Sequence, residues 1–389
     1  MTSPDLPLLS VRSPADLLAA VPYLLGFHPT DSVVVVALRG KRVVFVARAD
    51  LAGTESRPEA NGPTTVDQTT VDQTTVDPPP GADEIAAYIA EIVARQQVES
   101  TVAIGYGPAE QVTPAVDATR AALELAGLRV LDALRVTDGR YWSYLCVDPG
   151  CCPMEGKAYD PTSSQVAAEA TFAGKVALPD RAALTSQVAP LGGPVRESMR
   201  RATRRAEERA VRLLDSAPSA DLLGGRALRS AGASAIRTAM DRHRQGGRLT
   251  DDEVAWLSVL LTHVPVRDHA WERTDGFEWQ QALWTEVTRR VEPGLVAAPA
   301  SLLAFAAWRA GHGALAAVAV ERALRDQPDY SLALLLDEML RNGVQPSTLD
   351  GWPKVGSGRR RGRTTRRRSR GDTRGRARRR TNTRPGALA

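Results

Sequence analysis

The sequence has little of what disulfide-rich, membrane-spanning or secreted proteins need. Only 3 of its 389 residues are cysteine, too few for a disulfide framework. The longest apolar run near the start is SVVVVAL, well short of the roughly 18 apolar residues of a membrane helix. The first ten residues, MTSPDLPLLS, contain an acid and no base. We therefore expect no signal peptide, no membrane contact and a cytoplasmic location.

Lysine is scarce, and most of the positive charge lies at one end of the chain. Residues 354–389 hold 14 arginines and 1 lysine against 1 aspartate, a net charge of +14. Because the whole chain carries +5, residues 1–353 carry −9. This asymmetry predicts an interaction tail on an acidic body.

The arginine-rich tail predicts non-specific binding to a polyanion such as nucleic acid. No aromatic residue lies between 354 and 389, so the tail offers no platform for base stacking and would contact phosphates. The alternative is a solubilising or accidental extension. The candidate nucleic-acid-binding residues are Arg359, Arg360, Arg361, Arg366, Arg367, Arg368, Arg378, Arg379 and Arg380.

The first half of the chain alternates strand and helix patterns. Two valine-rich segments around Arg39–Lys41 predict a hairpin buried on both faces. The segments STVAIGYG and LRVLDALRV predict strands on either side of a helix that is expected to begin at Thr113 and Pro114. Strand, helix and strand with short connections indicate a parallel pair. We predict an α/β domain over residues 10–185, with a mixed, partly parallel sheet and flanking helices.

A repetitive segment interrupts this domain. A five-residue unit is repeated three times, as TTVDQ, TTVDQ and TTVDP, and ends in prolines. It has no apolar face that could offset the entropy of ordering it. We therefore predict a disordered, low-complexity insert over residues 52–81.

The second half reads as helices alone. Residues 195–345 are predicted to form an all-helical domain, followed by a disordered tail over 346–389. Thr250 and Glu253 have the spacing of a capping box. Its last part resembles one tetratricopeptide hairpin, with four residues at that family's spacings. They are Leu303, Ala316, Ala323 and Pro328.

All three cysteines lie in YWSYLCVDPGCCPMEG, residues 141–156. Cys146 and Cys151 have a spacing at the limit of zinc pairs, whereas Cys151 and Cys152 are adjacent and expected to point in different directions. The favoured interpretation is a strand through Cys146 followed by a Pro/Gly turn, with no bound metal and no cofactor.

Catalysis in the same region is the alternative. A nucleophilic thiol needs a base and a group that orients the base. The candidate catalytic residues are His28, Asp31, Tyr144, Cys146 and Glu155. The enzyme hypothesis requires these residues to meet at one edge of the sheet.

Three separate segments carry a resemblance to a known family. They are DLLAAVPYLLGFHPTDSVVVVAL, GRYWSYLCVDPGCCPMEG and the stretch from LLAFAAWRAG to SLALLL. Together they resemble the actinobacterial family of domain of unknown function 4192, which implies no activity, cofactor or site residue. The first functional hypothesis is a non-catalytic interaction or scaffold protein with an unidentified protein partner and a polyanion-binding tail. The second is an enzyme, thiol or metal site at the cysteine segment.

Overall fold

The structure is a computed structural model that describes residues 13–51, 81–161, 164–218, 221 and 225–350. These residues belong to one compact unit that ends at Asp350. The TTVDQ repeat and the arginine-rich tail lie outside the described residues, so the expectations for both stay predictions. The boundary between an α/β and a helical domain also stays a prediction.

The first half forms a mixed six-stranded sheet in the order β2-β1-β3-β4-β5-β6. Within this described sheet, β3 and β4 are the one parallel pair of strands, and α3 connects them, which confirms the predicted partly parallel sheet. The other neighbours are antiparallel. The strands are β1 (Ser32–Arg39), β2 (Arg42–Asp50), β3 (Ser100–Tyr106), β4 (Arg129–Thr137), β5 (Arg140–Ser143) and β6 (Lys157–Ala158).

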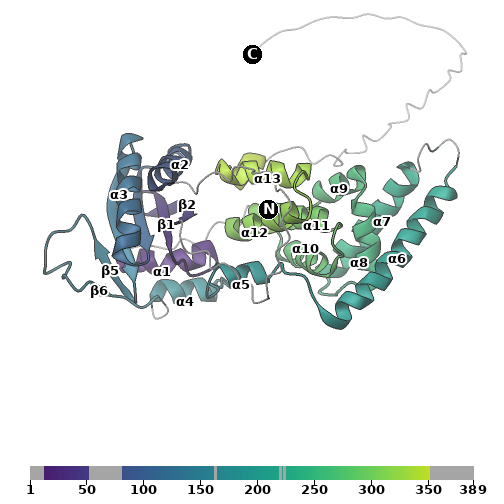
Figure 1. Cartoon of the computed structure of the whole chain (residues 1–389), viewed down its shortest axis with the longest axis horizontal. Helices are drawn as coiled ribbons and strands as arrows, with labels where there is room; N and C mark the ends of the chain where they lie inside the picture. Colours follow the sequence, from purple (N-terminus) through teal and green to yellow (C-terminus); the bar gives the residue numbers. More distant parts are fainter. Residues whose placement is uncertain (1–12, 52–80, 162–163, 219–220, 222–224, 351–389) are drawn as a thin grey trace, which may run out of the picture. The chain divides into compact units, whose positions relative to one another are not determined.

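Helices cover both faces of the sheet (Figure 1). Alternate residues of β1 face opposite ways: Val33 and Val35 pack with α2 and α3, whereas Val34 and Val36 pack with α1. α4 packs on α1. The helices of this half are α1 (Pro14–Leu25), α2 (Ala82–Ala94), α3 (Ala109–Leu125), α4 (Gln165–Phe172) and α5 (Arg181–Ser186).

Two local expectations were wrong. β1 is buried along nearly its whole length, but β2 is only half-buried because it is the edge strand of the sheet. α3 begins at Ala109 with Pro108 as its N-cap, and Pro114 lies inside the helix. Thr113 also lies inside the helix and so cannot cap it, and its hydroxyl hydrogen-bonds the hydroxyl of Tyr144 at 2.6 Å.

The second half of the described chain is helical, as predicted. Its core contains the fully buried Trp284, whose Nε1 donates to Thr274 Oγ1 at 3.1 Å. Thr250 and Glu253 form the predicted capping box at the start of α8. The helices are α6 (Gly193–Asp215), α7 (Gly225–Arg244), α8 (Asp251–Leu261), α9 (Val264–Trp271), α10 (Glu278–Arg290), α11 (Ala297–Arg309), α12 (Gly313–Asp326), α13 (Ser331–Arg341) and the 3₁₀ helix η2 (Pro346–Leu349).

α11 and α12 pack against each other across a short turn, and Leu303, Ala316 and Ala323 are fully buried. The small side chains of Ala316 and Ala323 allow the helices to approach closely. The likeness to a tetratricopeptide hairpin stays a prediction.

A polar network joins four helices of this half. His243 of α7 hydrogen-bonds Glu286 of α10 through Nε2 at 2.8 Å. Glu286 pairs with Arg290 one turn later, and Arg290 pairs with Asp251 of α8. The hydroxyl of Ser198 on α6 donates to Asp251. Burying charges is costly unless each has a partner, and here each charged member has one.

The end of α13 packs against α2 of the first half. The side-chain amide of Gln96 donates to the carbonyl of Gly343 at 3.1 Å. The hydroxyl of Tyr88 donates to the carbonyl of Arg341 at 2.7 Å. These bonds satisfy carbonyl groups that a helix leaves without partners at its C-terminus.

Candidate functional site

The segment 144–156, here called the cysteine loop, connects β5 to the edge strand β6. The side chain of Ser143 ends β5: its Oγ accepts hydrogen bonds from the backbone N–H groups of Leu145 at 3.2 Å and Cys146 at 3.0 Å. Ser143 Oγ also donates to Asp132 Oδ1 of β4 at 2.6 Å. The expected strand through Cys146 is therefore wrong: β5 ends at Ser143, and after a last backbone bond from the N–H of Tyr144 to the carbonyl of Ala133 at 2.8 Å, a local side-chain turn replaces the ladder.

Trp142 holds the other end of the loop. Its Nε1 donates to the carbonyl of Met154 at 3.0 Å. The guanidinium of Arg135, on the neighbouring strand, lies 3.8 Å from the centre of the indole ring. Gly156 lies against this ring, and the guanidinium of Arg140 donates to the carbonyl of Gly156 at 2.8 Å. Both ends of the loop are thus fixed to β5.

A tight turn at Asp148 folds the middle of the loop. The carbonyl of Asp148 accepts from the N–H groups of Cys151 at 3.1 Å and Cys152 at 2.7 Å. Its carboxylate Oδ1 accepts from the N–H of Gly150 at 2.9 Å. This Asx turn brings the two adjacent cysteines back toward Cys146.

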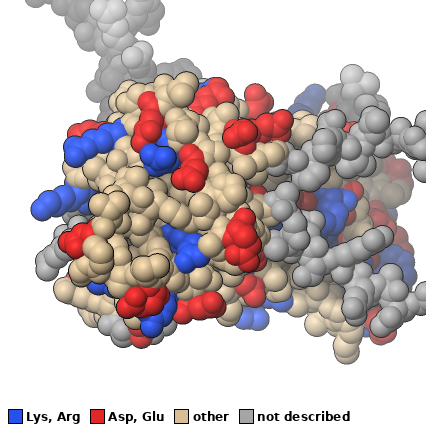
Figure 2. Space-filling view, turned by 60° about the vertical axis from the view of Figure 1, so that its left-hand side comes forward, with Lys and Arg blue, Asp and Glu red and all other residues tan. Residues whose placement is uncertain are grey.

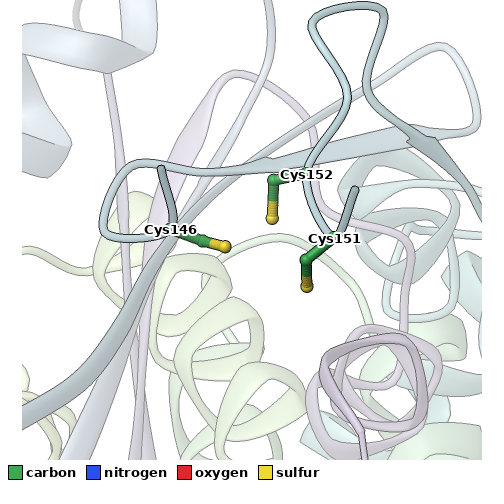
Figure 3. Close-up of side chains that lie close together, drawn as sticks. All are labelled: Cys146, Cys151 and Cys152. Carbon is green, nitrogen blue, oxygen red and sulfur yellow. The ribbon is translucent and has the colours of Figure 1, made fainter. Parts of the chain in front are cut away.

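The three sulfur atoms converge. The Sγ atoms of Cys146, Cys151 and Cys152 all lie within 4.8 Å of one another. Figure 3 shows the side chain of Cys146 pointing toward the other two, which extend in similar directions. The expectation that Cys151 and Cys152 point in different directions is wrong, because the turn at Asp148 curls the backbone so that both side chains reach the same space.

The three thiols differ in their electrostatics. A hydrogen bond from the backbone of Asp148 and a second from Cys152 lower the pKa of Cys146. The hydrogen bond to Cys146, followed by burial, raises the pKa of Cys152 to about 12. Of these two thiols, Cys146 is therefore the one that ionises first, and Cys152 keeps its proton. Cys151 is exposed, whereas Cys146 and Cys152 are partly buried.

This arrangement suits a thiophilic metal ion. Thiolates are soft ligands that select ions such as Zn²⁺ and Cu⁺. In a tetrahedral site with zinc–sulfur bonds of about 2.3 Å, the sulfurs are about 3.8 Å apart, so a small inward movement of these side chains would suffice. Among the described residues, the group of potential ligand atoms here consists of the three sulfurs alone. Three ligands leave a fourth position open.

The other candidate residues do not join the cysteines. His28 and Asp31 precede β1, at the end of the strands where Ser32 pairs with Tyr106. The first residue of β5 lies toward this same end, but the cysteine loop follows the last residue of β5, which points toward the other end of the strands. The structure therefore does not assemble the predicted catalytic group.

Tyr144 and Glu155 have other surroundings. The ring of Tyr144 packs in the core beside α2 and α3, and its hydroxyl is bonded to Thr113. Glu155 is exposed, and its backbone carbonyl accepts from Arg140 at 3.3 Å.

Sequence reasoning missed the residues that support the loop. Asp132 and Ser143 lie on different strands and meet only through the sheet register, in which Ser143 pairs with Leu134. A glycine at 156, just after the CCPME segment, was the one visible signal of a close contact. Its φ of +77° and its contact with Trp142 both require glycine.

A groove among the described residues lies elsewhere. It has a volume of about 490 Å³ and lies between α6, α7 and α8, where Arg209 and Trp256 line it. The guanidinium of Arg209 lies 4.1 Å from the centre of the Trp256 ring, so the two side chains form a cation–π contact with each other. No cysteine contributes to this groove, and the chemistry of the loop does not depend on it.

Within the described residues, every helix is too short or too polar to cross a membrane.

Comparison with known proteins identifies the family. No curated protein and no solved structure matches the chain. The family described as domain of unknown function DUF4192 matches residues 14–347, which is more than half of the chain and includes the sheet, the cysteine loop and the helices. The protein therefore belongs to the DUF4192 family.

Proposed function

We propose that the protein binds a zinc ion through the thiolates of Cys146, Cys151 and Cys152. The observation that carries this proposal is the convergence of the three sulfurs within 4.8 Å on a loop fixed at both ends. An ordered loop places its ligands before the ion arrives, so little entropy is lost on binding.

The surroundings support binding rather than catalysis. Zinc with three protein ligands has an open position, as in catalytic sites, but hydrolytic catalysis also needs a base near that position. His28 and Asp31, the candidates for this role, lie outside the cluster. In a reducing compartment such as the cytoplasm, the three thiols stay free to bind metal.

Elemental analysis of the full chain, purified under reducing conditions and reconstituted with zinc, tests this function. We expect about one zinc per chain, the stoichiometry of a single three-thiolate site. Cys146→Ser, Cys151→Ser and Cys152→Ser should each lose the ion. Val147→Ser is the matched control, because Val147 lies in the same loop, is 93% exposed and offers no ligand. Equal zinc content in the wild type and the three cysteine variants would overturn the proposal.

Polyanion binding by the arginine-rich tail is a second candidate function, which would make the protein an interaction protein. The charge distribution favours it: +14 in residues 354–389 against −9 in residues 1–353. On the face shown in Figure 2, acidic and basic residues of the described chain are interspersed, so that face has no large patch of one sign. The tail is the stronger candidate for contacts with phosphates.

Salt dependence tests the second function. If the tail neutralises about 8 phosphates of duplex DNA, the log–log slope of affinity against salt concentration should be near −7. The matched control is a chain ending at Trp352, which keeps the described unit and lacks the arginines. Equal DNA binding by both chains would exclude this role of the tail.

A further inference from the structure

We infer that the cysteine loop is also a site of oxidative modification by hydroperoxides, in which Cys146 forms a disulfide with Cys151 or with Cys152. The disulfide needs only the three thiols. Its consequence, release of the metal ion, rests on the zinc-binding function proposed above.

The geometry decides which pairs can form. Disulfides require Cα atoms about 4.4–6.8 Å apart, whereas adjacent residues joined by a trans peptide have Cα atoms only about 3.8 Å apart. Cys151 and Cys152 are adjacent, so a bond between them is strained. Four residues separate Cys146 from Cys151 in the loop, yet the Cys146 sulfur lies within 4.8 Å of both other sulfurs. Cys146 is therefore a member of every unstrained disulfide that the loop can form.

Exposure decides which thiol meets the oxidant. Cys151 is exposed, whereas Cys146 and Cys152 are partly buried. The Cys151 sulfur attacks one oxygen of the peroxide, the O–O bond breaks, and the products are a Cys151 sulfenic acid and one water, or an alcohol from an alkyl hydroperoxide. Sulfur is oxidised and the peroxide is reduced.

Cys146 then resolves the sulfenic acid. Its sulfur attacks the Cys151 sulfur, the S–OH bond breaks, and the hydroxyl leaves as water with the proton of the Cys146 thiol. The result is a Cys146–Cys151 disulfide. No external thiol is needed, because the attacking and accepting sulfurs already lie in the same cluster.

The third thiol gives the loop a second oxidised form. The Cys152 sulfur lies within 4.8 Å of the Cys146 sulfur in the reduced loop, so it is placed to attack the Cys146 sulfur of the first disulfide. That exchange forms Cys146–Cys152 and returns Cys151 as a free thiol, with no further oxidation. Either disulfide removes two of the three metal ligands.

Peptide mapping of the full chain tests the inference. Reduced, metal-free protein is treated with limiting hydrogen peroxide, alkylated and cleaved after Arg140 and Lys157, which releases all three cysteines in one peptide. We expect this peptide to lose two hydrogens and to carry one alkylated cysteine. Fragmentation should show that cysteine to be Cys151 or Cys152 and never Cys146.

Single variants make the test decisive. Cys151→Ser and Cys152→Ser should each still form one disulfide, whereas Cys146→Ser should form none and accumulate singly oxidised Cys151. A Cys151–Cys152 disulfide in the wild type, or a disulfide in Cys146→Ser as abundant as in the other variants, would overturn the inference. Cross-links between chains in place of the internal disulfide would also overturn it.

Zinc-loaded protein separates this inference from the proposed function. Peroxide should release one zinc for each disulfide formed, as followed with a coloured zinc chelator. Disulfide formation in a protein that never binds zinc would refute the zinc-binding function and leave the modification site standing. Zinc binding without any disulfide would refute the modification site and leave the zinc-binding function standing.

Discussion

The indole ring of Trp142 lies directly against Gly156 and closes the base of the cysteine loop. A Cβ atom added at Gly156 would lie 2.4 Å from Cε2 of the ring, a separation that packed atoms do not adopt. The backbone of Gly156 also has a φ of +77°, which residues with a side chain rarely adopt. Because of these two constraints, the contact between Trp142 and Gly156 fixes the end of the loop to β5.

Gly156→Ala should therefore destabilise the protein and weaken zinc binding. The matched control is Gly139→Ala, because Gly139 has a similar φ of +69° but its nearest neighbour would be 3.8 Å from the new Cβ. Both variants lose about 1–2 kcal/mol through backbone strain. Gly156→Ala should lose about 1–3 kcal/mol more through overpacking against Trp142. Equal melting temperatures and zinc affinities for the two variants would show that the contact between Trp142 and Gly156 is unimportant.

Ser143→Ala should loosen the start of the cysteine loop. It removes the hydrogen bond to Asp132 and leaves the N–H groups of Leu145 and Cys146 without their acceptor. A lost partner for a partly buried polar group costs about 1–3 kcal/mol. Chemical denaturation and zinc titration measure both effects.

Asp132→Asn is the conservative comparison for this prediction. Its amide oxygen can still accept from Ser143 and from the N–H of Ala133, which bonds Oδ1 at 2.9 Å. It should keep most of the stability and zinc affinity that Ser143→Ala loses. A larger loss in Asp132→Asn than in Ser143→Ala would contradict the role given to the serine hydroxyl.

Gly343→Ala should disturb the contact between α13 and α2. Gly343 has a φ of +62°, and a Cβ there would lie 2.5 Å from Cγ2 of Ile92. Gly311→Ala is the control, because Gly311 has a φ of +81° and open space around it. We expect a lower melting temperature for Gly343→Ala than for Gly311→Ala, together with faster hydrogen exchange in α2. The same melting temperature for both would indicate that this contact adds no stability.

The network around Glu286 should make stability depend on pH. Burial raises the pKa of Glu286, but the hydrogen bond with His243 and the charge of Arg290 outweigh burial and lower that pKa overall. Hydrogen bonding by Ser198 is the main cause that lowers the pKa of Asp251. A carboxyl with a lowered folded-state pKa stabilises the fold above its unfolded pKa, which is about 4.3 for glutamate. This stability is lost as the pH falls from there through the folded-state pKa.

Thermal unfolding between neutral pH and about pH 3 measures this loss. Glu286→Gln should be less stable than the wild type at neutral pH, and its melting temperature should fall less on acidification. Glu208→Gln is the control, because Glu208 is on the surface and its pair with Arg212 is 3.8 Å long. Parallel pH curves for the wild type and Glu286→Gln would contradict the prediction.

Signals between near neighbours were enough to predict much of the fold. The hairpin through Gly40, the parallel unit around α3 and the capping box of Thr250 all follow from residues a few positions apart. Each depends on backbone dihedrals, on the periodicity of side chains or on a local hydrogen bond, and these are set by neighbouring residues whatever the rest of the fold. The family resemblance was also visible in three short segments.

Tertiary structure decided the candidate site. Pairing of β4 with β5 places Ser143 beside Asp132, and this contact ends the strand before Cys146. Local rules alone suggested that neighbouring cysteines diverge, yet the turn at Asp148 turns both sulfurs toward Cys146.

The position of His28 was likewise undetermined by the sequence, because the order and direction of strands depend on which residues pair over long separations. The sequence by itself therefore determined the elements and the thiols that are present. Only the folded chain, through sheet register and loop closure, decided which side chains meet.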